Sequence, residues 1–319
     1  MVDKNTIQKY KDIFQNLNVD KNSNRYTAGK APHKPVLLLS LIVLRKNDRI
    51  NLRHIESNMD LRETWSGFWD CLEYENKGPI YLPFYHLKSD GFWNVKFNQD
   101  ITPHQPKSLR SLNKMIENVS LDEELIKLID DEDRCEKLIN SLLNGGYFSE
   151  QEREELVSKI NVLDESFKYE KKINKLVEKE FVIDHTSAKE EFKSSRDPAF
   201  RRSVLNNYDE TCTVCGLKIV TSNGISVIDA AHILPYHKFQ NDDIRNGLAL
   251  CKRHHWLFDH GIISVSPKYR VLVSKSVEKE HPESAISKFN KKKILLPKNK
   301  KNSPSDIALK WHMKKIFYR

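Results

Sequence analysis

The chain has 319 residues, of which 39% are hydrophobic and 30% are charged. This composition is typical of a globular protein of about two domains, and it excludes collagen-like, coiled-coil-only and wholly disordered chains. The excess of 53 Lys and Arg over 44 Asp and Glu permits binding to nucleic acid without demonstrating it. The longest apolar stretch, Val36–Leu44, is shorter than the roughly 18 residues that a membrane helix needs, and the charged start of the chain is not a secretory signal. We therefore expect no membrane partner.

The first 106 residues predict a mixture of helices and strands. Apolar residues three or four apart predict a helix over Met1–Leu17, and Lys34–Leu44 is apolar on all faces, which is typical of a buried helix. Pro35 suits the first turn of that helix, where its missing N–H costs nothing. Asn51–Glu63 is predicted to be a further helix. Ile80–Phe84 and Phe92–Phe97 are predicted to be strands on either side of the Ser89-Asp90-Gly91 turn.

The rest of the chain is predicted to be helical as far as about residue 180 and mixed thereafter. Leucine and isoleucine residues at helical spacing, from Leu121 to Leu143, predict helices, and Lys168–Phe181 is predicted to be a connecting helix. Pro198–Asn207 is predicted to be a helix that Asp197 caps. Three short strands are expected further on, at Ile225–Ile228, Ile262–Val265 and Arg270–Val273. The final Leu309, Trp311 and Phe317 are expected in the core.

The five cysteines indicate a metal site rather than a disulfide framework. Cys212 and Cys215 form a C-x-x-C motif before a glycine, and Cys251 and His254 form a C-x-x-H motif. Two such pairs can close a tetrahedral zinc site of the structural type. Cys71 and Cys135 stand alone, which suits a reducing compartment such as the cytoplasm. A zinc ion bound by Cys212, Cys215, Cys251 and His254 would join two segments that have little apolar core of their own.

A second group of residues surrounds these ligands. Its three sequence motifs are AAHI, which ends a predicted strand, NGLALC in the returning segment, and HHWLFDHG on a following helix. Their order resembles that of one subfamily of the HNH nucleases, whose site is a β-hairpin and a helix around a divalent metal ion. The resemblance implies that His232 is the general base, that His255 is a metal ligand, and that Asn246 holds the loop and orients the base or the metal. Many HNH sites have an Asp directly before the first His; here that residue is Ala231, and Asp229 is the nearest carboxylate that could ligate the metal.

These residue types suit the hydrolysis of phosphodiesters. The reaction needs a base that is neutral near pH 7, and histidine provides one. It also needs a cation that screens the phosphate and stabilises the leaving oxygen, for which we expect Mg²⁺ or Mn²⁺. Adjacent His254 and His255 can serve two different metals, because successive helical residues point about 100° apart.

The N-terminal region contains three further motifs, APHKPVLLL, LPFYHL and SDGFW. They resemble the sulfur-binding domain that precedes HNH domains in restriction endonucleases that attack phosphorothioate DNA. The resemblance implies that His33 and Lys34 approach the DNA backbone and that Pro83 lines an apolar cup for sulfur, with Leu82 and His86 at neighbouring positions. The family often has an aromatic residue where Leu82 stands and a small one where His86 stands. The cup could therefore read phosphorothioate, another modification or an unmodified sequence.

Together these interpretations predict an α+β protein. A mixed helical and strand DNA-recognition domain would span residues 1–165, a helical linker 166–190, and a ββα-metal (HNH) nuclease domain with its zinc knuckle 191–319. The predicted function is that of a type IV, modification-dependent restriction endonuclease acting on double-stranded DNA. A homodimer would supply two active sites for cutting both strands.

Three alternatives remain open at this point. The first is a sequence-specific type II HNH restriction endonuclease that acts on unmodified DNA and has a partner methyltransferase. The second is a zinc-knuckle DNA-binding protein without catalysis, against which His232, Asn246 and His255 argue. The third is a homing or toxin-type nuclease, which the large N-terminal domain makes a weaker interpretation.

Overall fold

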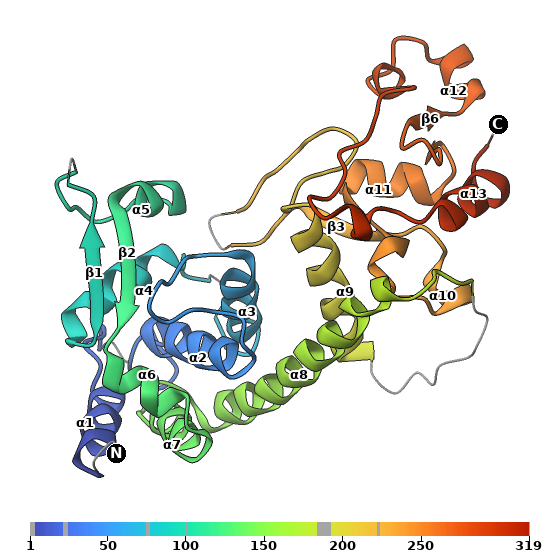
Figure 1. Cartoon of the computed structure of the whole chain (residues 1–319). Coiled ribbons are helices and arrows are strands. Elements are labelled where there is room, and N and C mark those ends of the chain that lie inside the picture. Colours follow the sequence, from blue (N-terminus) through green and yellow to red (C-terminus); the bar gives the residue numbers. More distant parts are fainter. Residues whose placement is uncertain are drawn as a thin grey trace. The chain divides into compact units, whose positions relative to one another are not determined.

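The computed structural model describes residues 4–21, 25–74, 77–99, 101–183, 193–221 and 224–318. The chain forms two compact units; the first extends to Asp164, and the second comprises most of the chain from Glu165 onward. Each unit combines helices with small antiparallel sheets (Figure 1), which confirms the α+β prediction. Within the described residues, no helix has the length and apolar character required to span a membrane. The predicted boundaries of the linker stay predictions, and residues 184–190 of it lie outside the described residues.

The first unit is built around one buried helix. Helix α2 (His33–Lys46) packs against α3, α4, α6 and α7, and its residues from Lys34 to Leu44 are all buried. Because this helix is apolar on every face, it is covered on all sides, as predicted. The elements around it are α1 (Lys4–Gln15), α3 (Met59–Trp69), α4 (Tyr81–His86), β1 (Trp93–Phe97), α5 (Leu109–Met115), β2 (Ile116–Leu121), α6 (Glu123–Ile129), α7 (Glu132–Leu143) and α8 (Glu150–Asn174). Strands β1 and β2 pair antiparallel from Trp93 opposite Leu121 to Phe97 opposite Ile116.

Three predictions in this unit were wrong. Ile80–Phe84 is not a strand but part of helix α4, in which Pro83 falls within the first turn and therefore needs no N–H partner. The helix predicted over Asn51–Glu63 begins only at Met59, because the Asn58 side chain caps its first turn. The segment before it instead hydrogen-bonds to strand β2, through the Ile55 amide and the Leu52 carbonyl. Leu121 ends that strand rather than starting a helix.

The second unit contains a β-hairpin followed by a helix. Strands β3 (Ile228–His232) and β4 (Gly247–Cys251) pair antiparallel, with His232 opposite Gly247 and Ile228 opposite Cys251. Helix α11 (Lys252–Asp259) follows β4 directly and contacts both strands, while α9 (Lys193–Asn207) packs on the same pair. The remaining α-helices and strands are α10 (Tyr236–Phe239), β5 (Ile263–Val265), β6 (Val271–Val273), α12 (Lys275–Glu280) and α13 (Asp306–Lys315), and the 3-10 turn η3 (Ile244–Asn246) directly precedes β4.

Strands β5 and β6 confirm the prediction of two short strands, and α13 packs back on β5 with Leu309 buried. Trp311 is only half-buried and contacts the ring of Phe239. Three boundaries differ from the prediction. Helix α9 begins at Lys193 and contains Pro198, so that Asp197 lies within it and pairs with Arg196 instead of capping it. Strand β3 begins at Ile228, where the predicted strand Ile225–Ile228 ends, and helix α8 ends at Asn174 rather than near Phe181.

Candidate functional site

The two cysteine motifs meet in the second unit. Cys212 and Cys215 lie in a turn after α9, which closes through a bond from the Gly216 amide to the Cys212 carbonyl, with Gly216 at a φ of +72°. Cys251 ends β4, and His254 lies in the first turn of α11. One donor atom from each of the four lies within 4.8 Å of the others, and His254 Nδ1 is 3.2 Å from Cys251 Sγ. The structure thus brings together all four predicted zinc ligands.

The chemistry of this cluster fits zinc. Three sulfur atoms and one imidazole nitrogen are a donor set that zinc prefers. Burial lowers the pKa of His254 to about 4, so its ring is neutral, as a ligand must be. Burial raises the pKa of the Cys212 and Cys251 thiols, and a bound cation would offset that cost by stabilising the thiolates. The cluster also fixes the start of helix α11, where the next residue is His255.

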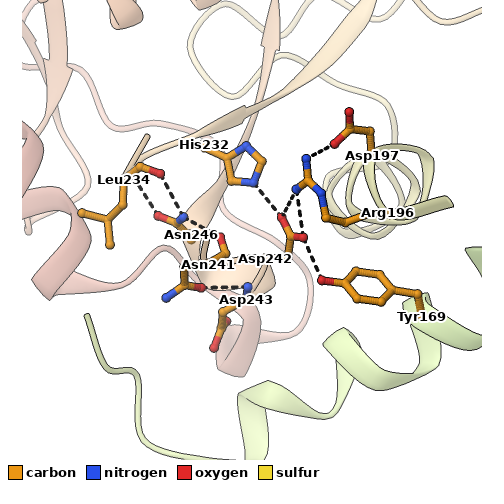
Figure 2. Close-up of polar contacts among 9 residues, drawn as sticks. All are labelled: Tyr169, Arg196, Asp197, His232, Leu234, Asn241, Asp242, Asp243 and Asn246. Carbon is orange, nitrogen blue, oxygen red and sulfur yellow. Dashed lines mark hydrogen bonds and ion pairs between the residues drawn. The ribbon is translucent and has the colours of Figure 1, made fainter. Parts of the chain in front are cut away.

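His232 lies at the end of β3 and is held by contacts on its edge and on its face. Its Nε2 atom is 2.9 Å from Asp242 Oδ1 (Figure 2). Its ring stacks on Phe200 of α9 with 3.8 Å between centroids and an angle of 7°. The side chain is 19% exposed, whereas that of Asp242 is 2% exposed. One edge of the imidazole therefore faces a buried carboxylate, and the side chain still reaches solvent.

Asp242 accepts hydrogen bonds from three different elements. Arg196 Nη1 of α9 lies 3.0 Å from both carboxylate oxygens, and the Tyr169 hydroxyl of α8 donates to Oδ2 at 2.9 Å. Figure 2 shows these donors converging on the carboxylate together with His232. Burial alone would raise the pKa of Asp242, but the bonds from His232 and Arg196 outweigh it and hold that pKa below its usual value.

Asn246 is fully buried in η3, directly before β4. Its side-chain oxygen accepts from the Leu234 amide at 2.8 Å, and its nitrogen donates to the carbonyls of Leu234 at 3.2 Å and Asn241 at 2.9 Å. These bonds close the loop between β3 and β4 at both of its ends. The side chain is thus engaged with the backbone, which favours the loop-holding part of its predicted role.

His255 and Asp229 are brought together between α11 and β3. His255 Nδ1 is 3.5 Å from Asp229 Oδ2, and its Nε2 is 3.4 Å from Asp259 Oδ2. Lys252 also pairs with Asp229 at 2.6 Å. Burial would raise the pKa of Asp229, but His255 and Lys252 together hold it down at about 2, so this carboxylate is ionised. The arrangement offers an imidazole and two carboxylates to a divalent cation.

The five predicted DNA-contacting residues of the first unit line one pocket with a volume of about 640 Å³. Leu82, Pro83 and His86 come from helix α4, and His33 and Lys34 from the start of α2. The remaining lining residues include Ala31, Arg25 and Tyr26 from the segment before α2. The pocket is open with the His86 side chain in place, so this departure from the family pattern does not fill it.

Of the two basic residues that α2 contributes to this pocket, Lys34 is paired with a carboxylate and His33 is neutral. Lys34 Nζ lies 2.5 Å from Asp90 Oδ2 and 3.1 Å from Ser89 Oγ, and the two charged side chains are only 7% and 2% exposed. Burial lowers the pKa of His33 to about 4, and its ring packs edge-on against Trp69 and Tyr26. The pocket therefore presents apolar walls beside a cation that already has an anionic partner.

Several of these residues were not found from the sequence. Asp242, Arg196 and Tyr169 lie 10, 36 and 63 positions from His232 and carry no motif of their own. Asp90 was interpreted only as a turn residue, although it neutralises Lys34. In each case the missing signal is a tertiary contact, which residue spacing does not show.

Comparison with protein families finds two matches. Residues 212–266 match the HNH endonuclease family. Residues 8–165 match the family described as the ScoMcrA-like DNA sulfur-binding domain. No curated protein sequence matches the chain. Among solved structures, a modification-dependent TagI restriction endonuclease is similar at 20% identity over 37% of each chain, with a TM-score of 0.27. The chain thus covers little more than a third of that structure.

The hairpin, the helix and the family match define a nuclease of the HNH class. The match to the sulfur-binding family extends over nearly the whole length of the first unit. The chain thus joins a region that matches the ScoMcrA-like DNA sulfur-binding domain family to a region that matches the HNH endonuclease family.

Proposed function

We propose that this protein is a modification-dependent restriction endonuclease that reads phosphorothioate DNA with its first unit and cuts it with its second. The observation that carries this proposal is the presence, in one chain, of a DNA sulfur-binding domain and an HNH endonuclease domain. Such a nuclease acts on double-stranded DNA, and we expect it in the cytoplasm, where incoming DNA is met.

The pocket suits sulfur for a physical reason. A sulfur atom that replaces a non-bridging phosphate oxygen is larger and less strongly hydrated, so apolar walls such as Leu82, Pro83 and Ala31 cost it little. Lys34 lies at the same pocket and can attract the negative charge of the phosphorothioate group, although its ammonium is already paired with Asp90. The neutral ring of His33 can donate a hydrogen bond without repelling or attracting charge.

In the second unit we assign His232 as the general base that takes the proton of the attacking water. Because Asp242 is ionised, Nε2 of His232 must carry the proton that it shares with that carboxylate, which leaves Nδ1 free to accept another. His255, with Asp229, would hold Mg²⁺ or Mn²⁺, which supplies positive charge for the phosphate and the leaving oxygen when bound. Cys212, Cys215, Cys251 and His254 would hold a structural Zn²⁺. Cutting both strands needs two such sites, and a homodimer would provide them.

The test compares the cleavage of matched duplexes that are plain, phosphorothioate-modified or cytosine-modified, each with Mg²⁺ or Mn²⁺. We expect cutting of the phosphorothioate duplex alone and its loss in His232→Ala. The matched control is His237→Ala, which removes an exposed histidine of α10 and should cut normally. Cutting of no duplex, or equal cutting by His232→Ala, would contradict the proposal.

A second candidate is a sequence-specific endonuclease of type II that acts on unmodified DNA beside a methyltransferase. It is favoured by Leu82 and His86, which line the pocket and depart from the pattern of the sulfur-binding family at those two positions. Cutting of the plain duplex at a fixed sequence would establish this alternative and leave the catalytic assignment unchanged.

A further inference from the structure

One buried carboxylate of the second unit contacts the proposed base. The Asp242 carboxylate is 2% exposed and receives His232, Arg196 and Tyr169. A buried carboxylate is costly unless several donors satisfy it. Three donors from three elements, α8, α9 and β3, meet at this one group (Figure 2).

The ring of His232 is fixed in two directions. Its edge is set by the 2.9 Å bond to Asp242, and its plane by stacking on Phe200. Arg196 is itself fixed, because its guanidinium lies 3.4 Å from the centre of the Tyr236 ring and it also pairs with Asp197. Rotation of the imidazole would break the hydrogen bond and the stacking contact together.

The orientation decides which nitrogen can act as a base. A neutral histidine has one N–H and one lone pair, and an anionic partner selects the tautomer whose proton points at it. His232 is bonded to Oδ1 of Asp242, the Tyr169 hydroxyl donates to Oδ2, and Arg196 Nη1 lies 3.0 Å from both oxygens. The carboxylate therefore keeps the proton on Nε2 and leaves the lone pair on Nδ1.

We propose that Asp242 is a positioning residue of the nuclease, held by Arg196 and Tyr169, which fixes the tautomer and orientation of His232. This inference rests on the proposed role of His232 as general base. It adds three residues from outside the HNH motifs to the catalytic machinery, and none of the three needs to touch DNA or metal.

The decisive variant is Asp242→Asn. The substitution removes the negative charge that selects the Nε2–H tautomer, and with the amide oxygen accepting from the Tyr169 hydroxyl at the Oδ2 position, the amide N–H₂ faces Nε2 of His232. The histidine proton then moves to Nδ1 and blocks the base. We expect the single-turnover cleavage rate of the phosphorothioate duplex to fall by about 100-fold or more, within the range that general-base catalysis contributes. The dissociation constant for that duplex, measured with Ca²⁺, should stay within about twofold.

The matched control is Asp243→Asn. Asp243 is the neighbouring buried carboxylate, and it pairs with Arg245 rather than with the histidine. Tyr169→Phe is a milder variant that removes only one hydroxyl, and its rate should fall about threefold to tenfold. Zinc content and circular dichroism establish that each full-length variant is folded.

Two further measurements separate this inference from the proposed function. In the His232→Ala background, neither Asp242→Asn nor Tyr169→Phe should lower the residual rate further, because both act through the histidine. Nitrogen-15 spectra of the histidine rings in the zinc-loaded full chain should show Nε2–H for His232 in the wild type and a shift toward Nδ1–H in Asp242→Asn but not in Asp243→Asn.

Each outcome decides one question. One outcome would overturn the positioning role alone. In it, His232→Ala loses cleavage, while Asp242→Asn and Tyr169→Phe keep the wild-type rate and the wild-type tautomer of His232. Full cleavage by His232→Ala would overturn the base assignment and the positioning role with it. An equal loss of rate in Asp243→Asn and Asp242→Asn, with no change of tautomer, would reduce Asp242 to a structural residue.

Discussion

The ion pair between Lys34 and Asp90 should contribute more to stability than a surface pair, because both side chains are buried. The two side chains are 7% and 2% exposed, and their charged atoms are 2.5 Å apart. Lys34→Met removes the ammonium and leaves the Asp90 carboxylate with the Asn18 amide and the Ser89 hydroxyl as neutral donors. Removing one partner of such a buried pair costs about 3–5 kcal/mol. We therefore expect a loss of about 3 kcal/mol in the free energy of unfolding.

The double variant Lys34→Met with Asp90→Asn should recover most of that loss, because no buried charge then remains. Urea unfolding of the full chain, followed by tryptophan fluorescence, measures both variants, since Trp65, Trp69 and Trp93 lie in the first unit. Arg53→Met is the matched control, because it breaks an ion pair with Glu123 in which both side chains are more than half exposed. If Lys34→Met shifts the unfolding midpoint no more than Arg53→Met, the buried-pair reasoning is refuted.

The same pair bears on DNA recognition. Each phosphate that a lysine neutralises contributes about 0.9 to the slope of log K against log salt concentration. If Asp90 keeps Lys34 neutralised in the complex, the double variant should bind the phosphorothioate duplex with an unchanged slope. A slope reduced by about one unit would show instead that Lys34 leaves Asp90 for the phosphate.

Three further outcomes are expected. Cys212→Ser, or chelation of zinc, should release the metal and unfold the second unit, as seen by metal analysis and circular dichroism; a stable, zinc-loaded variant would contradict the knuckle. Burial lowers the pKa of His312 from 6.5 to about 4, so between these pH values the unfolded chain binds a proton at this histidine and the folded chain does not. The free energy of unfolding should therefore be about 2 kcal/mol lower at pH 5 than above pH 6.5. His312→Phe, which keeps the stacking on Phe258, should remove that part of the pH dependence in urea unfolding at both pH values; an unchanged pH dependence would refute it. His86→Ala should widen the pocket and tighten binding of the phosphorothioate duplex several-fold relative to the plain one, and equal affinity for both would argue against sulfur recognition.

The elements that the sequence predicted well are those whose local pattern admits one packing. Helix α2 is apolar on all faces and has a proline where a first turn tolerates it, so burial at the centre of the unit satisfies every residue. The zinc cluster follows from two pairs of ligands with the same spacing, which fixes the local geometry at each pair. In both cases the information lies in short segments, one for the helix and one for each pair of ligands.

The wrong predictions concern segments whose conformation depends on distant partners. The residues before Met59 have helical spacing, but the Leu52 carbonyl and the Ile55 amide bond to strand β2, more than 60 residues away. The five residues from Ile80 to Phe84 are too short for their periodicity to separate a strand from a helix, and the structure makes them helical against α2. Tertiary hydrogen bonding and packing therefore override the local preference.

The same reasoning explains why the sequence indicated His232 and Lys34 but neither of their carboxylate partners. Reactive residue types stand out by their chemistry, whereas Asp242 and Asp90 act only through where the fold places them. In the nuclease unit, Asn246 connects a residue that the sequence indicated with one that it did not. Its side-chain amide donates to the Asn241 carbonyl, and Asp242 is the next residue. An asparagine that closes the loop thus also sets the position of the carboxylate that orients the base. On this reasoning, substitution of Asn246 would disturb the tautomer of His232 without any contact between the two side chains.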